Sequence, residues 1–369
     1  MRAILEVNLA TLRENYRHVS SVYGGGGYGG AVHAVLKRDA YQLGLARIGP
    51  LLAEAGCRGF FVETLSEARR LKTALQRRGY WPCEIYVLTG IGPHSAQAFA
   101  GTGISPLIAT REELARAAAQ SPGLEVGLIL ETGLGRPGLD AAGLEASAAA
   151  LSQLQIRHVM SHLADMKQPD SLRNQAQRSE FLRLLQHFPG VGHSLASSAF
   201  VFAGAKWHIG AARAGSAILG TRHVDNPAYQ TRPAVRLLAP VLSVSQHAAG
   251  EVLGYGGLRL TRESRIASIA LGYGDGLPAA FWQSSPRLRI AGMLCPLLPE
   301  LSMMHSFVDV TDLPAGAAAP GTMAEIFGTD PDLDSLAARL GMKPNQLLTQ
   351  VGGLCQRRYI TRPAPAGDC

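Results

Sequence analysis

The stretch Ala31-Val-His-Ala-Val-Leu-Lys37-Arg-Asp-Ala-Tyr41 decides how the rest of the sequence is interpreted. Its apolar run, Ala31 to Leu36, follows the glycine-rich tract Gly24 to Gly30 and ends abruptly at a lysine. Such a run between turn signals is typical of a buried strand, and α/β folds place their chemistry at the carboxyl ends of strands. Burial lowers the pKa of a lysine and makes its amine reactive toward a carbonyl group. A lysine that only extends from a core strand into water fits this stretch equally well.

Beyond this stretch, apolar runs alternate with helix-like segments over about 200 residues. Strand after helix after strand predicts a parallel sheet, and eight such runs match a (β/α)₈ barrel, which typically takes about 250 residues. The predicted strands are Ala31–Leu36, Arg58–Val62, Glu84–Leu88, Ser105–Ala109, Glu125–Leu130, Ile156–Ser161, Gly190–Ser194 and Gly215–Gly220. The predicted helices are Gln42–Ala55, Ser66–Arg78, His94–Ala100, Arg111–Ala119, Ala141–Gln153, Leu172–His187 and Ser198–Trp207. A doubly wound open sheet is the alternative, since the last two strands are short and rich in Gly and Ser.

From about Arg232 the pattern changes to strands broken by Gly and Pro, which marks a second, mostly β domain. Its predicted strands are Val235–Ser245, Arg265–Tyr273, Leu288–Leu298, Phe307–Thr311 and Met323–Phe327, and its predicted helices are Pro331–Leu340 and Asn345–Val351. The predicted fold is therefore α/β, with an N-terminal TIM-like barrel over residues 8–231 and a C-terminal mostly β domain over residues 232–369. No Gly-x-Gly-x-x-Gly fingerprint follows a first strand, so nothing supports a dinucleotide site.

Composition narrows the function classes. The chain has 369 residues, 47% of them hydrophobic, and a formal net charge of +7. The charge is scattered and mostly arginine, which argues against nucleic-acid binding and suits an anionic ligand. Five widely spaced cysteines form no disulfide framework and no metal motif, which favours a reducing compartment. No signal peptide or membrane span is evident, so we expect a cytoplasmic protein with no membrane partner and no metal.

The segment Lys37-Arg-Asp-Ala-Tyr41 resembles the lysine motif of the alanine racemase family. The resemblance extends over several motifs in family order, from Leu5 to Tyr359. It implies a pyridoxal 5'-phosphate (PLP) enzyme in which Lys37 forms a Schiff base with the cofactor and Tyr41 binds its phosphate. It also implies that the strand formed by residues 1–7 joins the C-terminal domain.

Further motifs resemble the cofactor contacts of this family. His162, in Met160-Ser-His-Leu-Ala-Asp165, resembles the histidine that lies against the pyridine ring, although a single histidine after an apolar run is often structural. Ser198 resembles the phosphate-binding serine and also begins a predicted helix, whose N–H groups suit an anion. Arg213-Ala-Gly215-Ser216 resembles the segment whose arginine bonds the pyridine nitrogen and whose backbone holds phosphate. An arginine stays protonated, so the ring remains a weak electron sink, which limits side reactions such as transamination.

The catalytic and substrate-binding residues are likewise implied by the resemblance. Tyr255, in Val252-Leu-Gly-Tyr255-Gly-Gly257, resembles the second catalytic base, which acts in the active site of the partner subunit. The protein would then be an amino acid racemase, an isomerase that exchanges the Cα proton between Lys37 and Tyr255, and a homodimer with shared active sites. The implied substrate-binding residues are Arg136, Tyr273, Met303 and Asn345.

Three departures from the family pattern leave room for a different activity. Ile129 stands where the family often has a lysine, which is carbamylated in some members. In its absence some other anion, or Glu131, must orient Arg136. Met304 alters the predicted entrance, and Asn345 stands where the family has a tyrosine that narrows the substrate path. The last change predicts acceptance of larger or more polar amino acids, serine first.

Three alternatives stay open. A PLP decarboxylase for basic or diamino acids is one, although its cysteine-and-acid motif is not evident and only Cys355 supports it. A PLP-holding protein without catalysis is the second, and the long β domain argues against it. A regulatory or structural family member is the third.

Overall fold

The computed structural model describes residues 2–24, 30–222 and 228–361. By its internal contacts the chain divides into two units. The barrel unit comprises Leu12–Ala40 and Gly44–Arg232, and the β unit comprises Met1–Thr11, Tyr41–Leu43 and Pro233–Cys369. Most of the glycine-rich tract Gly24 to Gly30, which the sequence predicts to be a turn, lies outside the described residues. The last of the five cysteines, Cys369, also lies outside them.

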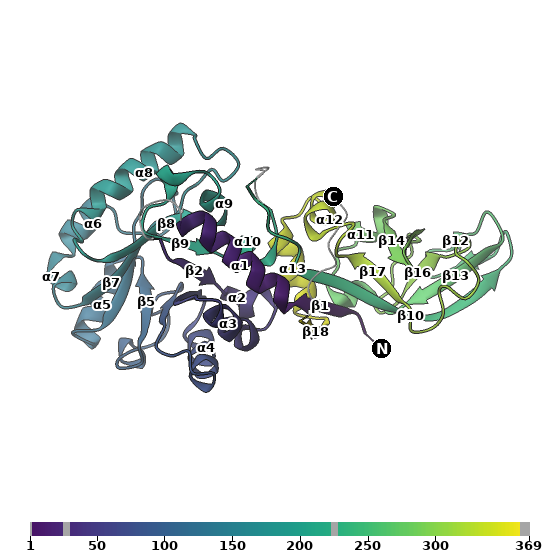
Figure 1. Ribbon diagram of the computed structural model, residues 1–369, viewed down its shortest axis with the longest axis horizontal. Helices are drawn as coiled ribbons and strands as arrows, with labels where there is room; N and C mark the ends of the chain where they lie inside the picture. The colour runs from purple at the N-terminus through teal and green to yellow at the C-terminus, as the bar shows by residue number, and fades with distance from the viewer. Residues whose placement is uncertain (1, 25–29, 223–227, 362–369) are drawn as a thin grey trace. The chain divides into compact units, whose positions relative to one another are not determined.

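The barrel unit contains eight parallel strands that close on themselves, because β9 pairs with β2 as well as with β8. The predicted (β/α)₈ barrel is therefore confirmed, and Figure 1 shows its helices around the outside of the strands. The strands are β2 (Val32–Val35), β3 (Gly59–Val62), β4 (Glu84–Val87), β5 (Ile104–Ile108), β6 (Glu125–Ile129), β7 (Gln155–Met160), β8 (Gly192–Ser197) and β9 (Ala211–Ala214). The helices are α1 (Leu9–Gly24), α2 (Lys37–Tyr41), α3 (Leu45–Glu54), α4 (Leu65–Arg77), α5 (Arg111–Gln120), α6 (Ala141–Ala146), α7 (Ala148–Leu151), α8 (Leu172–Leu185), α9 (Ser198–Val201) and α10 (Ser216–Leu219).

Side chains at the start of several helices fix where the strand-to-helix loops end. Thr64 and Thr110 each accept a hydrogen bond from the backbone N–H three residues later, at the start of α4 and α5. Asp140 and Ser171 do the same for α6 and α8. Such a cap satisfies one of the N–H groups that a helix leaves unpaired, so each loop meets its helix at a defined residue.

The prediction of the eighth strand was wrong. Gly215–Gly220 contains helix α10, and the strand that closes the barrel is β9, four residues upstream. A short buried apolar run does not reveal by its periodicity whether it is a strand or a helix. Gly220, with φ of 79°, ends α10 in the left-handed conformation, whereas β9 was concealed by its three alanines, which have low strand propensity.

Three other predictions need correction. Leu288–Leu298 is a hairpin of two strands rather than one strand, with Ala291 and Gly292 in its turn. The helix predicted from Gln42 begins only at Leu45, and the helix predicted at His94–Ala100 contains only the short 3₁₀ segment η1 (Ala96–Ala98). In both places turn geometry replaces the α-helix that the side-chain pattern suggested.

The β unit is built on an eight-stranded sheet in which β1 runs antiparallel to β10 and parallel to β18. Its strands are β1 (Ile4–Asn8), β10 (Val235–His247), β13 (Ser264–Ile269), β14 (Arg287–Ile290), β15 (Met293–Pro296), β16 (Ser306–Asp309), β17 (Met323–Phe327) and β18 (Gln356–Ile360), and β11 (Val252–Leu253) pairs with β12 (Leu258–Arg259) in a separate hairpin. Its helical elements are η3 (Tyr273–Asp275), α11 (Ala280–Gln283), α12 (Leu333–Arg339) and α13 (Pro344–Gly352).

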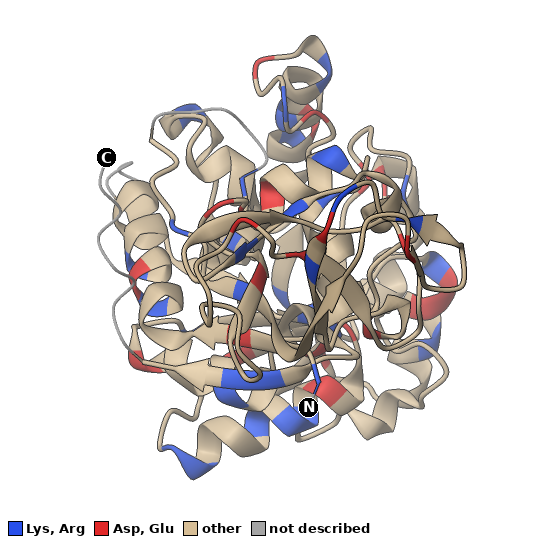
Figure 2. Cartoon of the chain, turned by 90° about the vertical axis from the view of Figure 1, so that its right-hand side faces the viewer, with Lys and Arg blue, Asp and Glu red and all other residues tan. Residues whose placement is uncertain are grey.

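Basic and acidic residues are interspersed along the chain, as Figure 2 shows for the ribbon seen from one side. Many of them pair locally, for example Arg183 with Glu180 and Arg262 with Asp309. None of the helices in the described part of the chain combines the length and the apolar character needed to cross a bilayer.

Candidate active site

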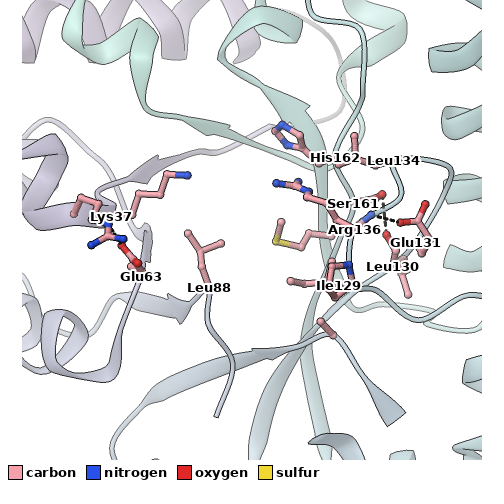
Figure 3. A pocket seen from close by; sticks show the side chains of 14 residues that line it. Lys37, Glu63, Leu88, Ile129, Leu130, Glu131, Leu134, Arg136, Ser161 and His162 are labelled. Carbon is pink, nitrogen blue, oxygen red and sulfur yellow. Dashed lines mark hydrogen bonds and ion pairs between the residues drawn. The ribbon is translucent and has the colours of Figure 1, made fainter. Parts of the chain in front are cut away.

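Lys37 follows β2 after a single residue, Leu36, where the barrel strands end. The lysine is exposed in this chain, so the expected partial burial of its amine is not observed. Figure 3 shows its side chain reaching into a pocket from one side, while Arg136 and His162 lie on the other side. No described carboxylate lies within ion-pair distance of Lys37.

The element α2 is not an ordinary right-handed helix, because the backbone after Lys37 follows a left-handed helical turn. Five consecutive residues that are not glycine, Arg38 to Gln42, have φ between 53° and 67°. The left-handed helical conformation costs roughly 1–2 kcal/mol per residue with a side chain. The turn persists only if its surroundings compensate for this strain. Tyr41 and Gln42, at its end, belong to the β unit, where Tyr41 is buried and its pKa is raised by that burial.

A cavity of about 520 Å³ opens in the barrel unit beside Lys37. Part of its wall is apolar, formed by Leu88, Ala109, Ile129 and Met160. Its charged lining residues are Lys37, Arg38, Glu63, Glu131 and Arg136. His162 also lines the cavity. Segments from different parts of the sequence thus bring Lys37, Arg136 and His162 to one cavity.

Arg213 lies within β9, and it is almost fully buried. Its Nη1 donates to the backbone oxygen of Ser194 at 2.7 Å and to the Oγ of Ser194 at 2.6 Å. Its Nη2 donates to the backbone oxygen of Ser161 at 2.5 Å and lies 3.4 Å from Nδ1 of His162. Burial lowers the pKa of Arg213 to about 10, so the guanidinium remains protonated at neutral pH.

The protonation of His162 follows from these neighbours. Burial, and then the positive charges of Arg213, Arg136 and Lys37, lower its pKa to about 3, so the imidazole is neutral at physiological pH. Arginine can only donate hydrogen bonds, so Nδ1 of His162 accepts and the ring proton belongs to Nε2. The ring is therefore a neutral donor through Nε2.

Arg136 brings a second guanidinium to the cavity, at the end of the loop that follows β6. It is exposed, and within the described ranges its side chain makes no hydrogen bond or ion pair. Glu131 does not pair with this guanidinium, because its carboxylate accepts the backbone N–H groups of Gly133, Gly135 and Arg136. These bonds hold the pKa of Glu131 low despite its partial burial. Glu131 therefore shapes the loop, while Arg136 remains available to an anion.

Ser198 follows the end of β8, and Gly215 and Ser216 follow the end of β9. The Oγ of Ser198 accepts the N–H of Gly215 at 3.1 Å and that of Ala217 at 3.3 Å. Both serines are almost fully buried. The Ser198 hydroxyl and the N–H groups at the start of α10 converge, an arrangement that suits the oxygens of a phosphate group.

Tyr255 lies in the turn between β11 and β12 of the β unit, and 95% of it is exposed. Gly254 and Gly257, with φ of 66° and 70°, provide the positive φ angles that this turn requires. Glu300 is buried, and its carboxylate accepts the N–H of Gly256 at 3.1 Å, a bond that stabilises the turn.

Two of the predicted substrate-binding segments of the β unit, those that contain Tyr273 and Met303, are joined by backbone hydrogen bonds. The N–H of Tyr273 bonds the backbone oxygen of Ser302, and the N–H of Gly274 bonds that of Met303, both at 3.0 Å. Tyr273 and Met303 remain about half exposed. Asn345 is the second residue of α13, and its Oδ1 is buried without a hydrogen-bond partner among the described residues.

Several residues around the site were not predicted from the sequence. His158 is buried in the barrel, and its Nε2 lies 2.7 Å from the Oγ of Ser194. Since Arg213 donates to this hydroxyl, the Ser194 proton points to His158, and the two side chains hold the guanidinium from within the barrel. Alternation along the strand, which places His158 and Met160 on the same face of β7, is the signal that could have identified it.

The charges of the site favour an anionic ligand. Lys37, Arg136 and Arg213 surround His162, and none of the three cations has a carboxylate partner in the part of the chain that the structure describes. No group of three or more His, Cys, Asp or Glu side chains within that part is arranged to hold a metal ion. The arrangement fits PLP, which carries a phosphate, a phenolate and an aldehyde that can react with an amine.

The sequence matches family models over most of its length. The model of the alanine racemase N-terminal domain matches residues 7–223, and that of the alanine racemase C-terminal domain matches residues 234–359. An alanine racemase of Acidiphilium cryptum is 39% identical over 332 residues, which cover 88% of this chain and 90% of the relative. An alanine racemase of a Methylobacterium species is 36% identical, over 97% of this chain and 98% of the relative.

Similarity does not separate a biosynthetic from a catabolic role. Two relatives from Mesorhizobium japonicum, one biosynthetic and one catabolic alanine racemase, are each 32% identical to this chain over most of both lengths. Among solved structures, the alanine racemase of Bartonella henselae with covalently bound pyridoxal phosphate has a TM-score of 0.86 at 27% identity, covering 98% of this chain and all of that one. The biosynthetic alanine racemase of Pseudomonas aeruginosa has a TM-score of 0.80 at 27% identity, with 98% and 100% covered.

Proposed function

The chain belongs to the alanine racemase family of PLP-dependent isomerases, and on this basis we propose that it interconverts L- and D-alanine. The observation that carries the proposal is the pocket at the barrel mouth, where Lys37 faces Arg136 and His162 and where no described carboxylate pairs with Lys37 or Arg136. We further propose that residues 8–231 form the PLP-binding domain, and that residues 232–369 together with strand 1–7 form the second domain.

Each part of the cofactor has a proposed partner in this chain. Lys37 would hold it covalently, and the buried guanidinium of Arg213 would donate to its pyridine nitrogen. Ser198, with the backbone of Gly215 and Ser216, would bind the phosphate, supported by the N–H groups that converge there. Tyr41 would add its hydroxyl to the phosphate, and His162 would lie against the ring. When bound, PLP supplies an electron sink that acidifies the Cα–H of an amine linked to it.

The amine of Lys37 and the hydroxyl of Tyr255 would move the Cα proton. A single base normally returns a proton to the face from which it was taken, so inversion needs two bases on opposite faces. A tyrosine with its ordinary pKa of about 10 is a poor base at neutral pH. The neutral His162, which donates through Nε2 and is polarised by Arg213, together with Arg136, would stabilise the phenolate.

Activity would require a homodimer, because Tyr255 is proposed to act in the active site of a second copy of the chain. Tyr255 is 95% exposed in the single chain, which supports the proposal. A catalytic base that acted within its own subunit would be expected to lie buried in the active site of that subunit. A small-molecule amino acid is the proposed substrate, and the proposed location is the cytoplasm.

A racemase of broader specificity that accepts serine is a second candidate. The buried Oδ1 of Asn345 has no hydrogen-bond partner in the described chain, so it could accept the hydroxyl proton of a polar substrate. Satisfying such a buried acceptor would favour serine over alanine at this position.

The test is a chiral assay of the purified protein with PLP in heavy water, against L-alanine, L-serine and the other common L-amino acids. Formation of D-alanine with deuterium at Cα supports the proposal, and Lys37→Ala should abolish both lysine-linked cofactor absorbance and turnover. Cofactor absorbance without deuterium uptake would instead identify a PLP-holding or regulatory protein. Release of carbon dioxide would identify a decarboxylase.

A further inference from the structure

The carboxylate of Glu67, on the first turn of α4, joins two strand-to-helix loops. Its Oε1 accepts the backbone N–H of Asp39 at 2.8 Å, and its Oε2 accepts that of Glu63 at 2.7 Å. Asp39 is the second residue of the left-handed turn after Lys37, and Glu63 directly follows β3. One side chain therefore fastens the turn to the neighbouring strand of the barrel.

Two side-chain pairs hold the same turn. The Nε of Arg38 lies 2.8 Å from Oε2 of Glu63, and Nη2 of Arg70 lies 3.0 Å from Oδ1 of Asp39. Asp39 also accepts the N–H of Leu45 at 3.0 Å, which connects the turn to α3. We call Glu63, Glu67 and Arg70 the α4 clamp.

The α4 clamp contacts the strained backbone that immediately follows Lys37. Arg38 and Asp39 have φ of 56° and 53°, which residues other than glycine rarely adopt. Without an acceptor for the Asp39 N–H, relaxation toward ordinary φ values would turn the chain after β2 and redirect the Lys37 side chain. Of the three clamp residues, only Glu67 bonds the backbone of the turn.

We propose that Glu67 is a positioning residue that fixes the left-handed turn and thereby holds the amine of Lys37 in the geometry in which it retains PLP. This inference rests on the proposed function, because Lys37 needs a fixed direction only if it holds the cofactor. Glu67 does not line the cavity, and its effect would pass through the backbone of Asp39.

The chain contains a matched control at Glu113. Thr64 and Glu67 begin α4 as Thr110 and Glu113 begin α5, with the threonine accepting the N–H of the glutamate in both. Glu113 likewise joins two loops, since Oε1 accepts the N–H of Ile91 at 2.6 Å and Oε2 that of Ala109 at 3.4 Å. Its bonds do not reach the turn that follows Lys37.

The experiment compares Glu67→Gln with Glu113→Gln in the full-length protein loaded with PLP. The carboxamide replaces one acceptor oxygen by a donor, so each variant loses a charge-assisted bond to a backbone N–H. Readouts are the urea midpoint, the rate at which visible absorbance of lysine-linked cofactor is lost on dilution, and the fraction of Lys37 trapped by borohydride. We expect similar shifts of the urea midpoint, but loss of cofactor about tenfold faster in Glu67→Gln alone.

Equal rates of cofactor loss in the two variants would overturn the inference while leaving the proposed function intact. Absence of lysine-linked absorbance in the unmodified protein would overturn the proposed function, and this inference with it. If Glu67→Gln does not fold, Arg70→Met takes its place, because Arg70 contacts Asp39 from the exposed side. Faster cofactor loss in Arg70→Met then supports the role of the clamp, and unchanged retention contradicts it.

Discussion

Replacing Arg213 by lysine keeps a positive charge in the barrel but removes the planar guanidinium, which donates hydrogen bonds to backbone oxygens of two different segments. The two terminal nitrogens of the guanidinium reach the backbone oxygens of Ser194 on β8 and of Ser161 just after β7. A lysine ammonium is a single point donor and cannot span both carbonyl groups in this geometry. We expect one buried carbonyl to lose its partner, at a cost of about 1–3 kcal/mol in the free energy of unfolding.

The substitution should also introduce a titration near neutral pH. Burial lowers the pKa of Arg213 from 12.5 to about 10. The same lowering applied to a lysine, whose ordinary pKa is about 10.4, gives a pKa of about 8. In Arg213→Lys the charge beside the pyridine nitrogen would therefore be lost as the pH rises through about 8, whereas the arginine keeps its charge there.

The assay follows the absorbance of lysine-linked cofactor and the racemisation rate between about pH 6.5 and about pH 9.5. Both should change with an apparent pKa of about 8 in Arg213→Lys, with no such step in the unmodified protein or in Arg183→Lys, an exposed control that pairs with Glu180. Superimposable pH profiles for Arg213→Lys and the unmodified protein would refute the reasoning, because they would show that the buried site does not penalise the ammonium.

Three further predictions concern the second base, the substrate and acid stability. Tyr255→Phe should leave PLP bound but strongly slow racemisation in both directions, measured by chiral chromatography, because inversion needs both bases; loss of cofactor binding would mean that Tyr255 is structural. Asn345→Tyr should lower the ratio of serine to alanine turnover, and an unchanged ratio would argue against the orphaned Oδ1 as a recognition group. Burial lowers the pKa of His33 from 6.5 to about 4, so its contribution to stability is complete above about pH 6.5 and is lost as the pH falls toward about 4. Between pH 7 and pH 5 the urea-derived free energy of unfolding should fall by about 2 kcal/mol less in His33→Phe than in the unmodified protein, and equal falls would contradict the assignment.

The sequence by itself determined the class of fold and the place of the lysine. The apolar runs before Lys37 and along the following strands have the length and period of buried parallel strands, and local pattern is enough to identify them. It was not enough for β9, because Ala211–Ala214 has little strand propensity and forms a strand only because the barrel must close between β8 and β2. Helix α10 was misassigned because so short a buried segment, with three apolar residues after Ser216, does not show by its pattern whether it is a strand or a helix.

Motif resemblance named Arg213 and His162, but only the tertiary structure decided their protonation and partners. The neutral state of His162 depends on charges contributed by other loops and strands, and the acceptors of Arg213 are backbone oxygens of Ser161 and Ser194, which no side-chain pattern reveals. The left-handed turn after Lys37 is the clearest case. Its residues have ordinary right-handed preferences, and the turn exists because Glu67, from the next helix, accepts an N–H that the local sequence leaves without a partner.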